Sequence, residues 1–208
     1  GVEIAVRRLG GSDPAYTWVP DGRAYATRFD DADLSVEVLD ETAKLDINVA
    51  DAVALARFFA ALGVDEPEAG RLGVSIVEHR QPLDIDAATG AAPEAYLQAG
   101  FGWGPKNALF ERIEELRRVP GVDQTLYRLA APHITVYSGT TPSPAYASPP
   151  VLASLGLDPV QIEQLVEERE LLADDTGGLP LPPDAFDPMV GGGTGTYSIR
   201  SVARLPDG

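Results

Sequence analysis

The sequence of 208 residues contains no cysteine, only two histidines and a single methionine. Without cysteine the chain has no disulfides, no thiolate metal ligands and no cysteine nucleophile. It also has no apolar run near the roughly 18 residues that a membrane-spanning helix needs, and no basic stretch of the kind that opens a secretory signal. The lack of cysteine suits the cytosol and the periplasm equally, so the compartment stays open at this point.

Positive charge is scarce as well. The chain has 16 Lys and Arg against 32 Asp and Glu, which gives a net charge of −16 at pH 7. A charge of this sign repels phosphate backbones and anionic membranes. We therefore expect neither nucleic acid nor a membrane surface as a partner of these residues.

Motifs of hydrolytic and nucleotide-dependent catalysis are absent. The sequence has no G-x-S-x-G elbow, no H-E-x-x-H pair and no GK[ST] loop. His79 ends an apolar helical pattern, where an imidazolium would meet the negative end of the helix dipole, and His133 starts a short extended run. Because spacing marks no partner for either histidine, we expect structural roles for both and no enzymatic activity.

The period of the hydrophobic pattern changes twice along the chain. Residues 16–47 and 196–205 alternate apolar and polar side chains as strands do, whereas residues 50–172 repeat at helical spacing. Within the helical stretch, one of the expected apolar faces is formed by Leu109, Ile113 and Leu116.

These periods predict an α+β fold with strands at both ends of the chain and a helical block between them. We expect the strands of both ends to pair in one antiparallel sheet. Residues 1–49 and 173–208 are assigned to the sheet domain, and residues 50–172 to an inserted all-α domain.

The signature Gly-apolar-Asp occurs three times, at residues 63–65, 121–123 and 156–158. Glycine supplies a left-handed turn and Asp caps the next helix, so the three copies predict helix-hairpin-helix-like repeats. Such units often bind DNA through backbone N–H groups and nearby cations. Here the turns carry Asp65 and Asp158, so we expect structural packing and negligible DNA binding.

The first residues repeat at near-helical spacing, and Gly10-Gly11 ends their pattern. We interpret them as the last turns of a longer helix, and the whole chain as a fragment lacking material at both ends. A short helix on a small sheet cannot bury every face on its own sheet. We therefore expect its apolar residues to be divided between the sheet and neighbouring subunits; they are Val2, Ile4, Val6 and Leu9.

Acidic residues gather in two loops. Asp84, Asp86 and Glu94 lie in a Gly- and Ala-rich stretch, and Asp174-Asp175 opens another stretch rich in Gly and Pro. Carboxylate oxygens on a loop are what Ca²⁺ requires, so these five residues are the candidate calcium ligands. Solvated surface is the alternative interpretation, because 32 acidic residues produce such pairs by chance.

Several segments together resemble one family. In chain order they are DETAKLDIN (40–48), YLQAG (96–100), GPKNALF (104–110), IEEL (113–116), VPGV (119–122), ITVYS (134–138) and PPVLASL (149–155). The stretch from residue 96 to residue 122 is the most specific part. The sequence resembles the general secretion pathway protein K family, the large minor pseudopilin of type II secretion systems.

The resemblance implies a pilin-like fold, in which an N-terminal helix packs on an antiparallel sheet and a helical domain is inserted among the strands. It also implies a non-enzymatic component at the pseudopilus tip that initiates or caps assembly for protein export across the outer membrane. Such a protein would face the periplasm and be anchored in the inner membrane by a helical segment absent from this chain. Its partners would be the other minor pseudopilins and the major pseudopilin. The alternative is a free periplasmic module that uses its helical hairpins to hold a ligand or nucleic acid.

Overall fold

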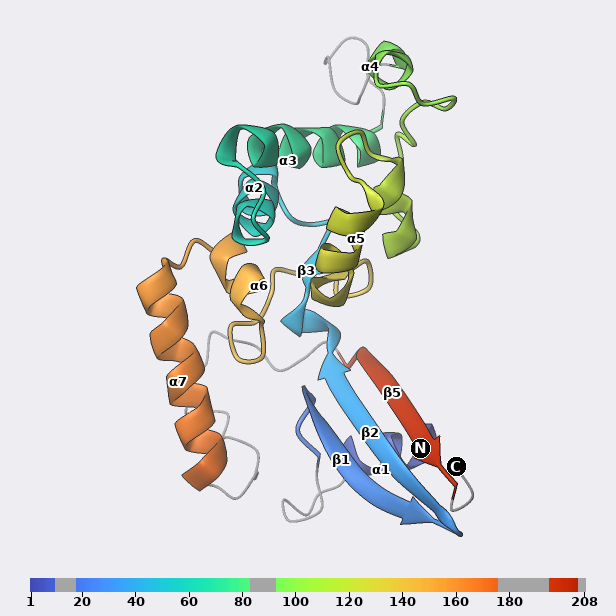
Figure 1. Cartoon of the computed structure of the whole chain (residues 1–208), viewed down its shortest axis with the longest axis vertical. Coiled ribbons are helices and arrows are strands. Elements are labelled where there is room, and N and C mark those ends of the chain that lie inside the picture. The colour runs from blue at the N-terminus through green and yellow to red at the C-terminus, as the bar shows by residue number, and fades with distance from the viewer. Residues whose placement is uncertain (10–17, 83–92, 176–194, 206–208) are drawn as a thin grey trace. The chain divides into compact units, whose positions relative to one another are not determined.

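The computed structural model describes residues 1–9, 18–82, 93–175 and 195–205 (Figure 1). The strands are β1 (Asp21–Phe29), β2 (Ala32–Asp40), β3 (Leu45–Asp46), β4 (Ile134–Thr135) and β5 (Tyr197–Arg204). The α-helices are α1 (Val2–Leu9), α2 (Ala52–Ala61), α3 (Glu66–Arg80), α4 (Pro93–Gln98), α5 (Gln124–Ala130), α6 (Pro149–Ser154) and α7 (Pro159–Asp175). The 3₁₀-helices are η2 (Glu41–Ala43), η3 (Ile113–Arg118) and η4 (Ala131–His133).

The chain divides into two compact units. The first comprises residues 1–43, 143–146 and 163–208, and the second comprises residues 44–142 and 147–162. Helix α7 belongs to both, because its first turn is part of the second unit and the rest is part of the first. These bounds differ from the expected inserted domain at both ends, and that division of domains stays a prediction.

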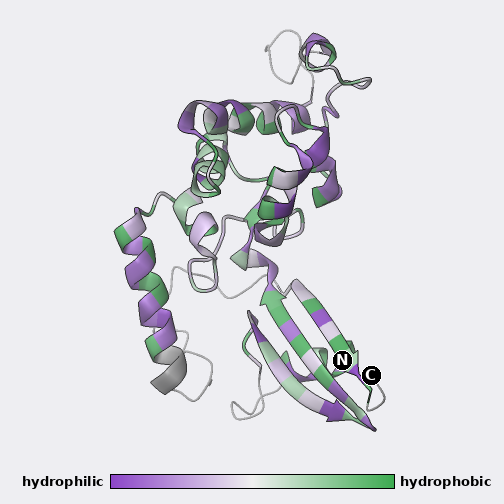
Figure 2. Ribbon diagram, viewed as in Figure 1, coloured by the Kyte–Doolittle hydropathy of each residue, from purple (hydrophilic) through white to green (hydrophobic). Residues whose placement is uncertain are grey.

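The sheet of the first unit has the strand order β1-β2-β5, with both neighbouring pairs antiparallel (Figure 1). The prediction that the two ends of the chain share one antiparallel sheet is therefore confirmed. Along the central strand β2 every second side chain is buried, at Leu34, Val36 and Val38. Figure 2 shows the corresponding alternation of hydrophobic and hydrophilic residues.

The second unit is mainly helical, and its core lies between α2 and α3. Helix α2 also contacts α6. The core side chains are at most 1% exposed; they include Leu55, Phe58, Phe59, Leu72 and Ile76. The helical spacing that the sequence shows over this region thus corresponds to a buried apolar face.

One strand assignment is wrong. Leu45 and Asp46 were expected in the antiparallel sheet, but they form β3, which pairs in parallel with β4 in the second unit. The 3₁₀-helix η2 separates β3 from β2 and redirects the chain. Both residues of β3 are buried, and a strand buried on both faces does not need to continue the alternation of β2.

The expected helical face at Leu109, Ile113 and Leu116 is also wrong in part. A 3₁₀-helix begins only at Ile113, and Leu109 is 59% exposed. The N–H and C=O groups of Phe110 both bond to the side chain of Asn48, so neither is free for a helical ladder. Tertiary hydrogen bonding therefore overrides the local period.

The three repeated turns share one backbone conformation. Gly63, Gly121 and Gly156 have φ angles of +93°, +91° and +92°. The carboxylate of Asp123 accepts the N–H of Leu126 at 2.7 Å, as an N-cap does. The first and third turns join two α-helices, whereas the second follows the 3₁₀-helix η3. The signature thus marks the turns, although not three equal helical hairpins.

Within the described ranges, no helix is long and apolar enough to cross a bilayer.

Candidate subunit interface and motif network

Helix α1 packs on the sheet of the first unit, and Figure 1 shows it behind β2. Ala5 is fully buried and forms a cluster with the alternate apolar residues of β2, to which Ile4 and Leu9 add partly buried side chains. The approach is close at the start of the helix, where a Cβ on Gly1 would lie 1.8 Å from Ser201 Oγ of β5. Because Gly1 and Ser201 are small, the start of the helix can pack closely on β5.

The charges of α1 match its direction. Glu3 lies in the first turn, and Arg7 and Arg8 lie in the last turn. A carboxylate near the positive end of the helix dipole and cations near the negative end each stabilise a helix by roughly 0.3–1 kcal/mol. The local sequence therefore supports a helix that has only eight residues.

Beside the face that packs on the sheet, α1 carries an exposed apolar pair. Val2 is 53% exposed and Val6 is 59% exposed, and residues four apart lie on one helix face. The four residues expected at a subunit interface are thus divided, since Ile4 and Leu9 turn to the sheet and Val2 and Val6 do not. Their role as an interface stays a prediction. Ala5 belongs to the same near-helical pattern of the sequence, but it was not among the four residues expected at the interface.

The sheet face away from α1 is charged. Asp33 and Glu37 alternate with the buried residues of β2, so they lie on the face opposite α1. Asp33 lies 3.9 Å from Arg28 of β1, and Glu37 lies 3.5 Å from Arg200 of β5. Exposed pairs of this kind contribute little stability. They make the surface around them unsuitable for apolar packing.

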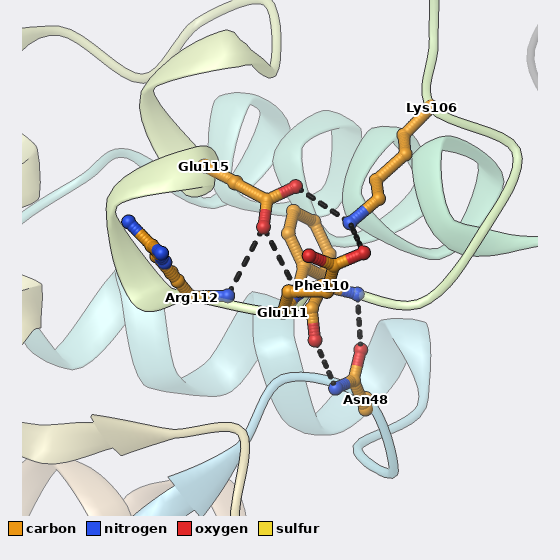
Figure 3. A network of polar contacts seen from close by, with 6 residues as sticks. All are labelled: Asn48, Lys106, Phe110, Glu111, Arg112 and Glu115. Atoms are coloured by element: carbon orange, nitrogen blue, oxygen red, sulfur yellow. Dashed lines mark hydrogen bonds and ion pairs between the residues drawn. The ribbon is translucent and has the colours of Figure 1, made fainter.

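A network of polar contacts in the second unit joins three of the segments that carry the family resemblance (Figure 3). Asn48 Nδ2 donates to the Phe110 carbonyl at 2.9 Å, and the Phe110 N–H donates to Asn48 Oδ1 at 2.8 Å. Lys106 Nζ lies 2.8 Å from Glu115 and 3.5 Å from Glu111. Residues 106–115 are thereby held to one another and to the turn after β3.

Glu115 is the acceptor at the centre of this network. Its carboxylate accepts the backbone N–H groups of Glu111 at 2.9 Å and Arg112 at 3.0 Å, besides the ammonium of Lys106. Burial alone would raise the pKa of Glu115, but the hydrogen bonds from Lys106 and the two N–H groups lower it below its ordinary value. The carboxylate is ionised and saturated, so its role is to fix the loop.

Asp46 connects the network to a further segment of the resemblance, residues 134–138. Its carboxylate accepts the N–H of Asn48 at 2.8 Å, the N–H of Gly139 at 2.8 Å and the hydroxyl of Ser138 at 3.2 Å. Arg80 donates to the carbonyls of Ile47 and Ala50 from the other side of the same turn. Residues 46–48, 106–115 and 138–139 are therefore brought together by direct contacts.

His79 is part of the core, and His133 is half-buried against it. His79 is 1% exposed, its Nδ1 lies 2.5 Å from Tyr96 Oη, and its ring stacks on Phe110. His79 lies in the last turn of α3 as expected, but burial lowers its pKa to about 4 and so disfavours the imidazolium that would meet the helix dipole. The neutral form is favoured because the ring is desolvated, and the helix dipole does not compensate.

His133 contacts Ser148, whose Oγ lies 2.8 Å from its Nδ1, and it packs edge-on against Phe58. Burial lowers the pKa of His133, and no carboxylate of a described residue acts on this ring as the third member of a catalytic triad would. His133 ends η4 directly before β4, close to the expected strand start.

The candidate calcium ligands are not assembled in the described part of the chain. Asp84 and Asp86 lie outside the described residues, and Asp174 and Asp175 are the last residues of α7. Glu94 is exposed in the first turn of α4. Among described residues, no three histidine or acidic side chains lie together as metal ligands would. The calcium site stays a prediction.

Known proteins are similar to this chain both in sequence and in fold. No protein with a curated description matches the chain. Among solved structures, the fold is similar to a chain in the crystal structure of the GspK-GspI-GspJ complex from the enterotoxigenic Escherichia coli type 2 secretion system, with a TM-score of 0.60 and 16% identity. That similarity covers 98% of this chain and 83% of the other.

A family model, that of type II secretion system protein K, matches residues 31–139. The matched stretch runs from β2 to the end of the Asp46 network and includes all the segments that contact one another there. It is more than half of the 208 residues. This chain therefore belongs to the type II secretion system protein K family.

Proposed function

We propose that this chain is a non-enzymatic minor pseudopilin that works at the tip of the pseudopilus, where it initiates or caps assembly for protein export across the outer membrane. The observation that carries the proposal is the division of α1 between a face packed on the sheet and an exposed face with Val2 and Val6. A helix with a second, uncovered apolar side is suited to packing against the helix of another subunit. The burial of His79 and the packing of His133 against Phe58 support a structural protein.

The proposed partners are the other minor pseudopilins, together with the major pseudopilin. The related chain of known structure was crystallised in a complex named GspK-GspI-GspJ, which supports this choice. Membership of a secretion-system family supports a periplasmic location. Anchoring in the inner membrane through an N-terminal helix is part of the proposal.

The test replaces Val2 and Val6 together by Asp and measures co-elution with the other minor pseudopilins of the same system. A carboxylate on each exposed position would have to be desolvated in a helix–helix contact, so co-elution should be lost while the circular dichroism spectrum is unchanged. Val53→Asp is the matched control, because Val53 is 57% exposed on a helix of the other unit. If the double variant still co-elutes, the interface lies elsewhere and this proposal is wrong.

We also propose calcium as a structural ion held by Asp84, Asp86, Glu94, Asp174 and Asp175. The carboxylate donor set fits the oxygen preference of Ca²⁺, and the exposed Glu94 is the one side chain of the five that the structure describes. Binding to the native state alone would raise stability by about 2.7 kcal/mol at a hundredfold excess over Kd. A melting temperature that is the same in millimolar Ca²⁺ and in chelator would contradict the proposal, and Mg²⁺ is the matched control ion.

A further inference from the structure

The second unit contains a cavity of about 400 Å³ that the network and the α1 face do not use. The described residues that line it are Trp103, Glu114, Arg117 and Arg118. We propose that this cavity binds a segment of a partner protein in which an acidic residue follows an apolar one. The apolar side chain would lie against Trp103 and the carboxylate would pair with the two arginines. This inference does not depend on the assembly role of α1.

Trp103 is exposed but held in place. Half of its surface, 51%, is open to solvent. Its ring lies 5.2 Å from the ring of Phe101, which lies 6.1 Å from Tyr96, and Tyr96 is buried against His79. A row of rings thus connects the exposed indole to the core. An aromatic side chain fixed before binding loses little conformational entropy on contact, which favours recognition.

Arg117 is also oriented before any ligand arrives. Its Nε donates to the carbonyl of Glu114 and one terminal nitrogen donates to Gln124 Oε1, each at 3.3 Å. The guanidinium carbon lies 5.2 Å from the centre of the Tyr127 ring. Both bonds are long and the acceptors are neutral, so the arginine keeps its charge available for a carboxylate.

Arg118 is the second cation of the cavity. It lies in the last turn of η3 and is exposed, and its guanidinium makes no hydrogen bond or ion pair with any other described residue. Neither Arg117 nor Arg118 pairs with a carboxylate of a described residue, which is unusual on a chain with twice as many acidic as basic residues. A planar guanidinium binds a carboxylate through two parallel hydrogen bonds, which an ammonium cannot do.

The same charges indicate which anion fits. The net charge of −16 opposes nucleic acids and anionic membranes, whose binding rests on many phosphate contacts. Glu114 at the edge of the cavity further disfavours a doubly charged phosphate, while it can accept an N–H group of a peptide backbone. The volume lies within the range of about 300–1,000 Å³ typical of ligand pockets. A single carboxylate beside an apolar side chain therefore suits the site best.

Fluorescence of Trp103 provides the test. The chain has two tryptophans, so Trp18→Phe leaves Trp103 as the only one; Phe can keep the stacking that Trp18 makes on Tyr25. The probe is the blocked peptide acetyl-Gly-Phe-Glu-Gly-amide, titrated at low salt, with the Gln-containing peptide as its match. We expect a saturable blue shift with the Glu peptide, affinity at least about tenfold lower for the Gln peptide, and weakening by added salt.

Variants distinguish peptide binding in the cavity from nonspecific electrostatic attraction. Arg118→Ala and Arg117→Ala should each lower the affinity about tenfold or more, and Arg118→Lys should recover only part of the loss. Arg128→Ala on α5 is the control, because Arg128 is exposed in the same unit and does not line the cavity. Equal affinity for the Glu and Gln peptides would overturn the proposal. So would unchanged binding by Arg118→Ala, or a Trp103 response to inorganic phosphate or phosphatidylglycerol vesicles without one to the Glu peptide.

Discussion

Asn48 uses its side-chain amide to satisfy both backbone polar groups of Phe110, 62 residues further along the chain, with hydrogen bonds of 2.9 Å and 2.8 Å. The amide thereby makes the two hydrogen bonds that the backbone of a neighbouring strand would otherwise make. Phe110 is itself buried, so its N–H and C=O could not turn to water instead. Asn48 thus fixes the backbone of Phe110, while the Glu115 carboxylate holds the N–H groups of Glu111 and Arg112 at the start of η3.

Asn48→Ala should destabilise the second unit by about 1–3 kcal/mol, because it leaves a buried N–H and a buried C=O without partners. Urea denaturation followed by circular dichroism measures the change in the free energy of unfolding. Val49→Ala is the control, because Val49 is 40% exposed and its truncation removes no hydrogen bond. Equal stability of the two variants would show that the Asn48 contacts contribute nothing.

The buried His79 should make stability depend on pH. The unfolded chain protonates this imidazole near pH 6.5, whereas the pKa in the folded state is lowered to about 4, chiefly by burial, with Lys106 and Arg118 in the same direction and Glu115 opposing. Between these values the unfolded state binds more protons, so stability falls as pH decreases from about 6.5 to 4. One proton corresponds to a slope of about 1.4 kcal/mol per pH unit at most.

His79→Gln should show a shallower slope than the wild type over this pH range, while the contribution of His133 remains in both. An NMR titration of the wild-type ring protons gives a second reading that needs no variant. A His79 that protonates in the folded protein at pH 6 would contradict the neutral, Tyr96-bonded ring seen in the structure.

Two of the repeated turns allow the cost of a steric contact to be separated from the cost of a left-handed backbone conformation. A Cβ on Gly63 would meet nothing within 4 Å, whereas a Cβ on Gly121 would lie 2.7 Å from Leu72 Cδ2. Gly63→Ala should therefore cost only the left-handed backbone strain, roughly 1–2 kcal/mol. Gly121→Ala should cost about 1–3 kcal/mol more, because Leu72 is buried and cannot move freely. Equal losses in thermal unfolding would show that the Leu72 contact is unimportant.

The local hydrophobic pattern predicts part of this fold, and contacts between distant segments determine the rest. The alternation along β2 and the glycines of the repeated turns were readable from the sequence, because each follows from the geometry of a few neighbouring residues. The pairing of β3 with β4 joins residues 89 positions apart and leaves no local signal. The burial of His79 leaves no local signal for the same reason, since Tyr96 and Phe110 contact the ring from other segments.

The candidate sites show the same limit. The spacing of apolar residues identified the side chains of α1 that are candidates for burial. On an eight-residue helix it could not tell which of them the sheet would bury. Trp103 and the two arginines of the cavity come from separate segments, and only the fold brings them together. Neither surface has a motif of its own, so composition and spacing could not reveal them.

The closest contact between α2 and α3 gives a prediction with opposite signs at two glycines of one helix. Alanine is the better helix former, so Gly70→Ala, whose Cβ would meet nothing within 4 Å, should stabilise the protein by about 1 kcal/mol. A Cβ on Gly73 would lie 2.3 Å from the carbonyl oxygen of Ala52, which is backbone and cannot rotate away. Gly73→Ala should then force the two helices apart around Leu55 and Leu72 and destabilise the protein by about 1–3 kcal/mol, despite the same gain in helix propensity. Thermal unfolding of the two variants under one set of conditions decides the matter: if both raise the melting temperature, the backbones of α2 and α3 are further apart than the structure has them.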